Sequence, residues 1–229
     1  MEVIVSATPQ QTAADALSAL LVQYAARPVL LLLSGGSALS FLDLVQTDVV
    51  GPLVTVTVLD ERFSTDPAVN NFAQLEQTAF YGTCVARGAC TLSTLVIPGD
   101  RLADLAGRFE SALHTWKKAH PDGVVITTMG IGTDGHTAGI LPGAPASVLA
   151  GGEWVIGYTV PVLTNPFTER VTVTATFLRT MVDAAVVFAL GETKRAYIER
   201  IQHTECSLAE IPAAVLCDMS FVQIVTDGV

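Results

Sequence analysis

Residues 28–42, PVLLLLSGGSALSFL, combine a continuously apolar run, a glycine pair and a helical pattern. The run at residues 28–33 has no polar side chain, which is typical of a strand buried on both faces of a parallel sheet. SGGS at residues 34–37 ends the run, and residues 38–46 continue as an expected helix. The stretch therefore predicts a strand–loop–helix unit of an α/β fold.

The same alternation of short β-branched runs and longer helical runs continues along the chain. The expected strands are residues 2–6, 28–33, 54–59, 91–97, 124–128, 155–160, 170–174, 184–190 and 221–225. The expected helices are residues 10–26, 38–46, 70–80, 102–118 and 192–202, with one more from Ala175. Because no repeat or linker interrupts this rhythm, we expect one Rossmann-like domain over residues 1–229, with a mainly parallel sheet flanked by helices.

The net charge of the chain is −10, from 12 basic and 22 acidic residues. Nucleic acids and anionic membranes select for basic surfaces, so this charge argues against both as partners. The apolar runs are far shorter than the ~20 residues that a membrane span needs, and no secretory signal is expected. The composition favours a cytoplasmic protein that binds an anion only where a few basic side chains converge.

The cysteines form no C-x-x-C pair and have no histidine at the spacing of zinc ligands. They are Cys84, Cys90, Cys206 and Cys217. We therefore expect free thiols in a reducing compartment, and no metal site.

Four loops follow expected strands, and all four carry chemically unusual residues. They are SGGS at 34–37, LDERF at 59–63, MGIGTDGH at 129–136 and ALGETKR at 189–195. In open α/β sheets, ligands bind outside the carboxyl ends of the strands. The site is therefore expected where these loops meet.

Several residues in these loops suit an anion. Gly35 and Gly36 let the backbone approach a ligand at a helix N-terminus, where Ser37 either donates its hydroxyl or caps the helix. Arg62 can fork onto phosphate oxygens, although charged residues at strand ends are usually solvated. Lys194 lies early in a helix, against the helix dipole, and a bound anion would remove that conflict.

Other polar residues near these loops keep two interpretations each. Asp60 at a strand end is suited to proton transfer, or is simply solvated. Asn71 caps the next helix or hydrogen-bonds a ligand. Arg170 begins a strand-like run, and neither Glu61 nor Arg195 receives a role from the sequence.

The stretch MGIGTDGHTAGILPG, residues 129–143, has three interpretations: a nucleotide loop, a catalytic loop or a tight turn. Gly130, Gly132 and Gly135 match G-x-G-x-x-G, but no helix opens directly after them and no acid ends the next strand. Asp134 instead precedes His136 by two residues, a spacing that can set the imidazole tautomer. A lone histidine is more often structural than catalytic, yet this one is flanked by glycines at a strand end, which favours catalysis.

Together with the RVTVT run at residues 170–174, these loops resemble the 6-phosphogluconolactonase family, which is itself similar to the glucosamine-6-phosphate deaminases. The resemblance extends over residues 30–194 and is strongest at G-x-G-x-D-G-H-T-A. It implies hydrolysis of 6-phosphoglucono-1,5-lactone in the cytosolic pentose phosphate pathway, without metal or organic cofactor. The implied partner is a small phosphorylated lactone, and the chain is expected to be a monomer or homodimer.

The resemblance also implies roles for individual residues. His136 would be the general base on water, with Asp134 orienting it or holding a substrate hydroxyl. The backbone of residues 130–135, Gly132 included, would stabilise the oxyanion, and Asp60 and Asn71 would line the sugar. The phosphate positions fall on Gly35, Gly36, Ser37, Arg62, Arg170 and Lys194.

Three other functions remain open from the sequence. A sugar-phosphate isomerase or deaminase would act on glucosamine 6-phosphate, but the related deaminases carry an acid where this chain has Leu141 and lack an arginine at the position of Arg62. A non-catalytic sugar-phosphate sensor would need neither Asp134 nor His136. An NAD(P)-binding protein is the weakest alternative, because the glycine pattern lacks its structural context.

Overall fold

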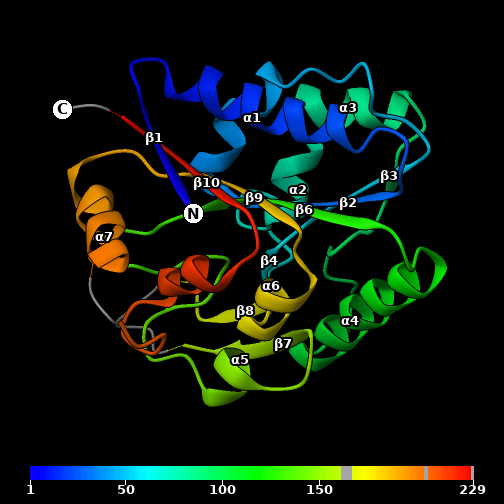
Figure 1. Cartoon of the computed structure of the whole chain (residues 1–229). Helices are drawn as coiled ribbons and strands as arrows, with labels where there is room; N and C mark the ends of the chain where they lie inside the picture. The colour runs from blue at the N-terminus through cyan, green and yellow to red at the C-terminus, as the bar shows by residue number, and fades with distance from the viewer. Residues whose placement is uncertain (161–166, 204–205, 228–229) are drawn as a thin grey trace.

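The computed structural model describes residues 1–160, 167–203 and 206–227. Its centre is a seven-stranded sheet in which all neighbouring pairs are parallel, in the order β1-β10-β9-β6-β2-β3-β5 (Figure 1). The strands are β1 (Glu2–Ser6), β2 (Val29–Leu33), β3 (Val54–Val58), β5 (Cys90–Thr91), β6 (Val124–Gly130), β9 (Ala184–Phe188) and β10 (Val222–Asp227). The predicted α/β fold with a mainly parallel sheet flanked by helices is confirmed.

Helices cover both faces of this sheet and create two hydrophobic cores (Figure 1). One core contains side chains of α1 (Pro9–Gln23), the 3-10 helix η1 (Gly36–Leu44), α2 (Asn71–Glu76) and α3 (Ala79–Ala86). The other contains side chains of α4 (Leu102–Ala119), α5 (Ala146–Ala150), α6 (Ala175–Met181), α7 (Glu192–His203) and the 3-10 helix η2 (Pro212–Asp218).

Strand β2 shows why its sequence is continuously apolar. Successive side chains point to opposite faces of a strand, so Leu30 and Leu32 enter one core while Leu31 and Leu33 enter the other. All four are 1% exposed or less. The expectation of a strand buried on both faces is confirmed.

A second, antiparallel sheet lies beside the helices of the α4 face and has the order β4-β8-β7. It consists of β4 (Asp60–Arg62), β7 (Val155–Thr159) and β8 (Glu169–Val173). The sequence places DER at the end of the third strand, but β3 ends at Val58 and these residues form a strand of their own. Two expected strands, 155–160 and 170–174, thus pair outside the parallel sheet.

The prediction of a strand over residues 91–97 is wrong beyond Thr91. Side chains bind the backbone that follows: Ser93 Oγ accepts from the Leu95 amide, and Asp100 Oδ2 accepts from the Ile97 amide. Thr94 is fully buried and turns inward. Side-chain hydrogen bonds thus replace strand pairing in this segment.

Two expected helices also differ in detail. Residues 70–80 contain α2 and the start of α3, which continues to Ala86. The two helices are separate because Thr78 caps α3: its Oγ1 accepts from the Tyr81 amide at 3.1 Å. Residues 38–46 form part of the 3-10 helix η1, which begins at Gly36. The short elements β4, α5 and η2 have too few residues for a periodic signal, and the sequence did not reveal them.

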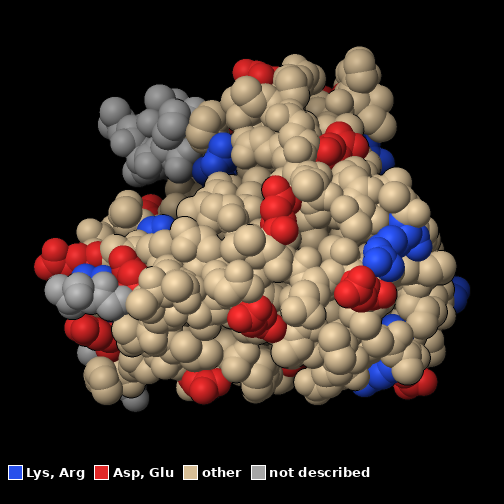
Figure 2. All heavy atoms as spheres, turned by 90° about the horizontal axis from the view of Figure 1, so that it is seen from above, with Lys and Arg blue, Asp and Glu red and all other residues tan. Residues whose placement is uncertain are grey.

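Over the residues described, no helix is long and apolar enough to cross a membrane. Figure 2 shows acidic and basic side chains scattered over one face of the molecule, with uncharged surface between them.

Candidate active site

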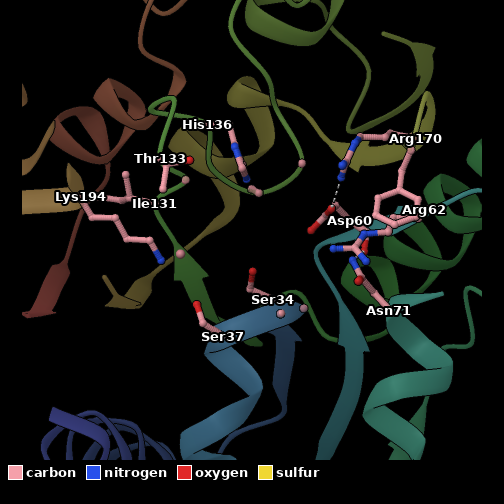
Figure 3. A pocket seen from close by; sticks show the side chains of 17 residues that line it. Ser34, Ser37, Asp60, Arg62, Asn71, Ile131, Thr133, His136, Arg170 and Lys194 are labelled. Carbon is pink, nitrogen blue, oxygen red and sulfur yellow. Dashed lines mark hydrogen bonds and ion pairs between the residues drawn. The ribbon is translucent and has the colours of Figure 1, made fainter. Parts of the chain in front are cut away.

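The loops at the carboxyl ends of β2, β3, β6 and β9 meet around one cavity of about 330 Å³ (Figure 3). All nine residues expected to bind substrate line it, and so does His136: Gly35, Gly36, Ser37, Asp60, Arg62, Asn71, Gly132, Arg170 and Lys194. Asp134 is not part of the lining but contacts His136. The chain thus gathers residues separated by up to 159 positions, Gly35 to Lys194, around one space.

His136 and Asp134 form a hydrogen-bonded pair in the loop after β6. Asp134 Oδ1 lies 2.5 Å from His136 Nδ1 and also accepts from the His136 amide at 3.1 Å. Burial would raise the pKa of Asp134, but the hydrogen bonds and charge of His136 lower it overall. An ionised Asp134 holds the proton on Nδ1, which leaves Nε2 as the basic nitrogen of the ring.

Gly132 makes this pair possible, because its backbone passes directly beneath the ring. A Cβ at position 132 would lie 2.1 Å from His136 Nδ1 and 2.7 Å from Asp134 Oδ1. The Gly132 amide donates to the His136 carbonyl at 2.8 Å, and the Gly135 amide donates to the Gly132 carbonyl at 3.1 Å. These two amides are used within the loop, so Ile131 and Thr133, which line the cavity, are better placed to offer an N–H to a ligand.

One end of the cavity combines the SGGS loop with Lys194. Figure 3 shows Lys194 extending toward Ser37 across the cavity from α7. Gly36 has φ 65°, a left-handed conformation that glycine adopts without strain, and η1 begins at this residue. Backbone N–H groups, a hydroxyl and an ammonium group at one end of a cavity are the donors that bind a phosphate.

Arg195, the neighbour of Lys194, faces elsewhere. Its Nη1 lies 3.0 Å from Asp227 Oδ1 at the end of β10. It does not line the cavity, so its charge serves an ion pair with the last strand.

Two arginines and one carboxylate lie across the cavity from Lys194 (Figure 3). Arg170 Nη1 lies 3.5 Å from Asp60 Oδ2, and both side chains are less than a tenth exposed. Arg62 stacks over the Phe167 ring, with its guanidinium carbon 4.5 Å from the ring centre. Burial lowers the pKa of Arg62, and the charge of Asp60 opposes this by raising it.

The cavity therefore concentrates positive charge in an acidic protein. Of the described residues that line it, three are basic, out of 12 in the whole chain, and Asp60 is the one acid. Charges inside a half-buried cavity interact more strongly than charges in open water. The lining favours an anionic ligand.

Asn70 and Asn71 divide two roles that the sequence could not separate. Asn70 Oδ1 caps α2 by accepting from the Ala73 amide at 2.8 Å. Asn71 instead donates its Nδ2 to the Asp60 carbonyl at 2.9 Å and lines the cavity. Asn71 Oδ1 has no hydrogen-bond partner among the described residues, and it lies 2.3 Å from where a Cβ at Gly35 would be.

The lining residues that the sequence did not single out as individual ligands include Ser34, Thr133 and Phe167. Ser34 and Thr133 lie inside the two glycine-rich loops, so their place in these loops could have predicted that they line the cavity. Phe167 lies just before β8, and nothing local in the sequence connects it with Arg62. Glu61 was given no role, and it is fully buried behind the cavity wall.

In residues 1–160, 167–203 and 206–227, no group of three or more His, Cys, Asp or Glu side chains is arranged to hold a metal ion. The four cysteines are free thiols.

Solved structures with the same fold are numerous. The 6-phosphogluconolactonase of Trypanosoma brucei has a TM-score of 0.75 at 19% identity, covering 99% of this chain and 95% of its own. The enzyme of Shewanella baltica has a TM-score of 0.75 at 17% identity, covering 99% and 97%. That of Thermotoga maritima has a TM-score of 0.75 at 15% identity, covering 99% and 98%. At these identities the likeness shows the fold.

Sequence comparison with curated proteins finds no significant match. The family model described as glucosamine-6-phosphate isomerases/6-phosphogluconolactonase, however, matches residues 5–224, nearly the whole chain. The chain therefore belongs to the glucosamine-6-phosphate isomerase/6-phosphogluconolactonase family.

Proposed function

We propose that the chain is a carboxylic ester hydrolase that converts 6-phosphoglucono-1,5-lactone to 6-phosphogluconate, a reaction of the pentose phosphate pathway in the cytoplasm. The observation that carries the proposal is the Asp134–His136 pair at a cavity with three basic residues. Family membership and fold agree with this choice, because the structures compared above are named 6-phosphogluconolactonases.

The proposed chemistry needs one base and one water. His136 Nε2 takes a proton from the water as its oxygen attacks the lactone carbonyl, and a tetrahedral oxyanion forms. The oxyanion then collapses, the bond to the ring oxygen breaks, and His136 returns the proton to that oxygen. The oxygen and one hydrogen of the water end in the new carboxyl group. Its other hydrogen ends on the former ring oxygen, so atoms and protons balance.

Asp134 and the loop backbone support these steps. The carboxylate of Asp134 stabilises the imidazolium that forms when His136 holds the proton. The N–H groups of Ile131 and Thr133 are our candidates for binding the oxyanion. Neither step requires a metal or an organic cofactor.

We assign substrate binding to the basic groups on the two sides of the cavity and to the polar groups between them. The phosphate would bind between these sides, where the family resemblance implies the SGGS loop and Lys194 on one side and Arg62 and Arg170 on the other. Asp60 and Asn71 would line the sugar.

Leu141 argues against deamination of glucosamine 6-phosphate. It stands five residues after His136, is 2% exposed and does not line the cavity, so this position supplies no second acid–base group. Ring opening with loss of an amine needs more proton transfers than lactone hydrolysis does.

The test is lactone hydrolysis measured against the spontaneous background, because δ-lactones open unaided in water. The wild type should exceed that background, and His136→Asn should lower kcat by about 10²-fold or more with little change in Tm. Ammonia release from glucosamine 6-phosphate would establish the deaminase instead. Binding of 6-phosphogluconate with no turnover of either substrate would leave a sugar-phosphate sensor.

A further inference from the structure

Glu61 is a fully buried carboxylate that lies just outside the cavity lining. Its Oε1 accepts from the Arg62 amide at 2.8 Å and the Asn71 amide at 2.6 Å. Its Oε2 accepts from the Phe72 amide at 3.0 Å and from Thr94 Oγ1 at 2.9 Å. One side chain thus ties together β4, the first turn of α2 and the segment after β5.

Two of the four residues that Glu61 holds line the cavity. Arg62 and Asn71 each receive one hydrogen bond at the backbone, and both side chains face the cavity (Figure 3). The amide of Asn71 has a defined orientation, because the Asp60 carbonyl accepts hydrogen bonds only and must face Nδ2. Asn71 Oδ1 is therefore turned toward Gly35, a lining residue.

The number of donors explains why a carboxylate stands here. Four N–H and O–H groups converge on two oxygens, and only an ionised carboxylate accepts from all four without offering a hydrogen of its own. Within the described residues Glu61 has no Lys, Arg or His within ion-pair distance, so the four hydrogen bonds are its direct partners. Burial raises the pKa of Glu61 to about 7, although all four hydrogen bonds lower it.

A buried carboxylate without a direct ion pair is costly, and a neutral side chain could join the same elements at a lower free-energy cost. The placement of this carboxylate directly behind two cavity-lining residues calls for a functional reason. The backbone positions of Arg62 and Asn71 decide where a guanidinium group and an amide side chain line the cavity.

We propose that Glu61 is a positioning residue for substrate binding: it holds the backbone of Arg62 and Asn71 so that both side chains face the phosphorylated substrate. The proposal rests on the proposed function, since it takes the ligand to be a sugar phosphate. It assigns Glu61 to binding and leaves the proton transfers to His136.

The decisive variant is Glu61→Gln, which keeps the shape but replaces one acceptor oxygen with an NH₂ group. The NH₂ group donates hydrogen bonds and cannot accept them, yet the groups opposite it are donors too. At least one of the four hydrogen bonds is therefore lost. We expect KM for the lactone to rise about tenfold or more, the factor that loss of a hydrogen bond to a charged group produces. We expect kcat to change by less than about threefold, because His136 and Asp134 stay in place.

Glu110→Gln is the matched control. Glu110 Oε1 also accepts a backbone hydrogen bond, from the Trp154 amide at 2.8 Å, but the residue does not line the cavity. This variant should leave KM and kcat unchanged even if its Tm falls. Thr94→Val is the milder companion, because it removes one of the four donors to Glu61 without touching a lining residue. It should raise KM about two- to threefold, in line with loss of one partly compensated hydrogen bond.

Calorimetric binding of inorganic phosphate and 6-phosphogluconate separates this proposal from the proposed function, because it needs no turnover. If the wild type hydrolyses no lactone but binds 6-phosphogluconate, and Glu61→Gln weakens that binding about tenfold, the lactonase proposal fails and the role of Glu61 stands. An unchanged KM and unchanged binding in folded Glu61→Gln would overturn the role of Glu61. So would a fall in kcat alone, or a wild type that binds neither ligand. If Glu61→Gln does not fold, Thr94→Val becomes the deciding variant. Unchanged KM and unchanged ligand binding in Thr94→Val would then overturn the proposal.

Discussion

Replacing Gly132 with alanine should disable the Asp134–His136 pair while leaving the fold intact. The new Cβ would stand 2.1 Å from His136 Nδ1, whereas ordinary contacts of a Cβ begin near 3.4 Å. The imidazole must therefore move by about 1.3 Å or the loop must open, and either change breaks the hydrogen bond to Asp134. Misplacement of a catalytic group by about 1 Å costs on the order of 10²-fold in rate.

The expected result is a fall of about 10²-fold in kcat with KM changed little, because no phosphate-binding side chain moves. Position 132 does not have a positive φ, so alanine brings no backbone strain and Tm should fall by only a few degrees. The assay is initial-rate lactone hydrolysis with subtraction of the spontaneous rate, alongside thermal unfolding followed by circular dichroism.

Gly152→Ala is the matched control for this substitution. Its Cβ would meet no atom within 4 Å, and the residue does not line the cavity, so kcat should be unchanged. A Gly132→Ala variant with wild-type kcat would refute the reasoning, because the pair would then be dispensable or the loop freely adaptable. Equal losses in both variants would point to a general effect of alanine in these loops.

Three further perturbations test other parts of the site. Asp134→Asn should lower kcat about 10²-fold, because an amide can donate to Nδ1 and favour the wrong tautomer; unchanged kcat with a normal pH profile would contradict this. Arg170→Met should lower the free energy of unfolding by roughly 3 kcal/mol, since it leaves Asp60 buried without that ion pair; adding Asp60→Asn should restore part of the loss in urea titrations, and strictly additive losses would argue against the coupling. Burial raises the pKa of Glu61 from 4.5 to about 7, so its contribution to stability is complete below pH 4.5 and is lost as the pH rises through 7. The wild type should therefore lose about 3 kcal/mol more unfolding free energy than Glu61→Gln between pH 4.5 and 8, and parallel curves would contradict the raised pKa.

Local sequence patterns were enough to predict the parallel sheet and the loops that carry the site. Buried parallel strands need continuous apolar runs such as residues 29–33, and the next residues leave the sheet at its carboxyl edge. Those two local facts suffice to bring the SGGS loop, the loop of His136 and the start of α7 to one cavity. Residue types at each strand end then suggested an anion and one base.

Contacts between segments far apart in the chain could not be predicted from local patterns. The antiparallel pairing of β4 with β8 joins residues about 110 positions apart, and it both buries Glu61 and sets Arg170 against Asp60. Three residues such as DER have no periodicity from which to tell a solvated strand end from a buried strand. Whether Glu61 faces water or four donors depends on Thr94 and α2 packing against it, and that is a property of the assembled chain alone.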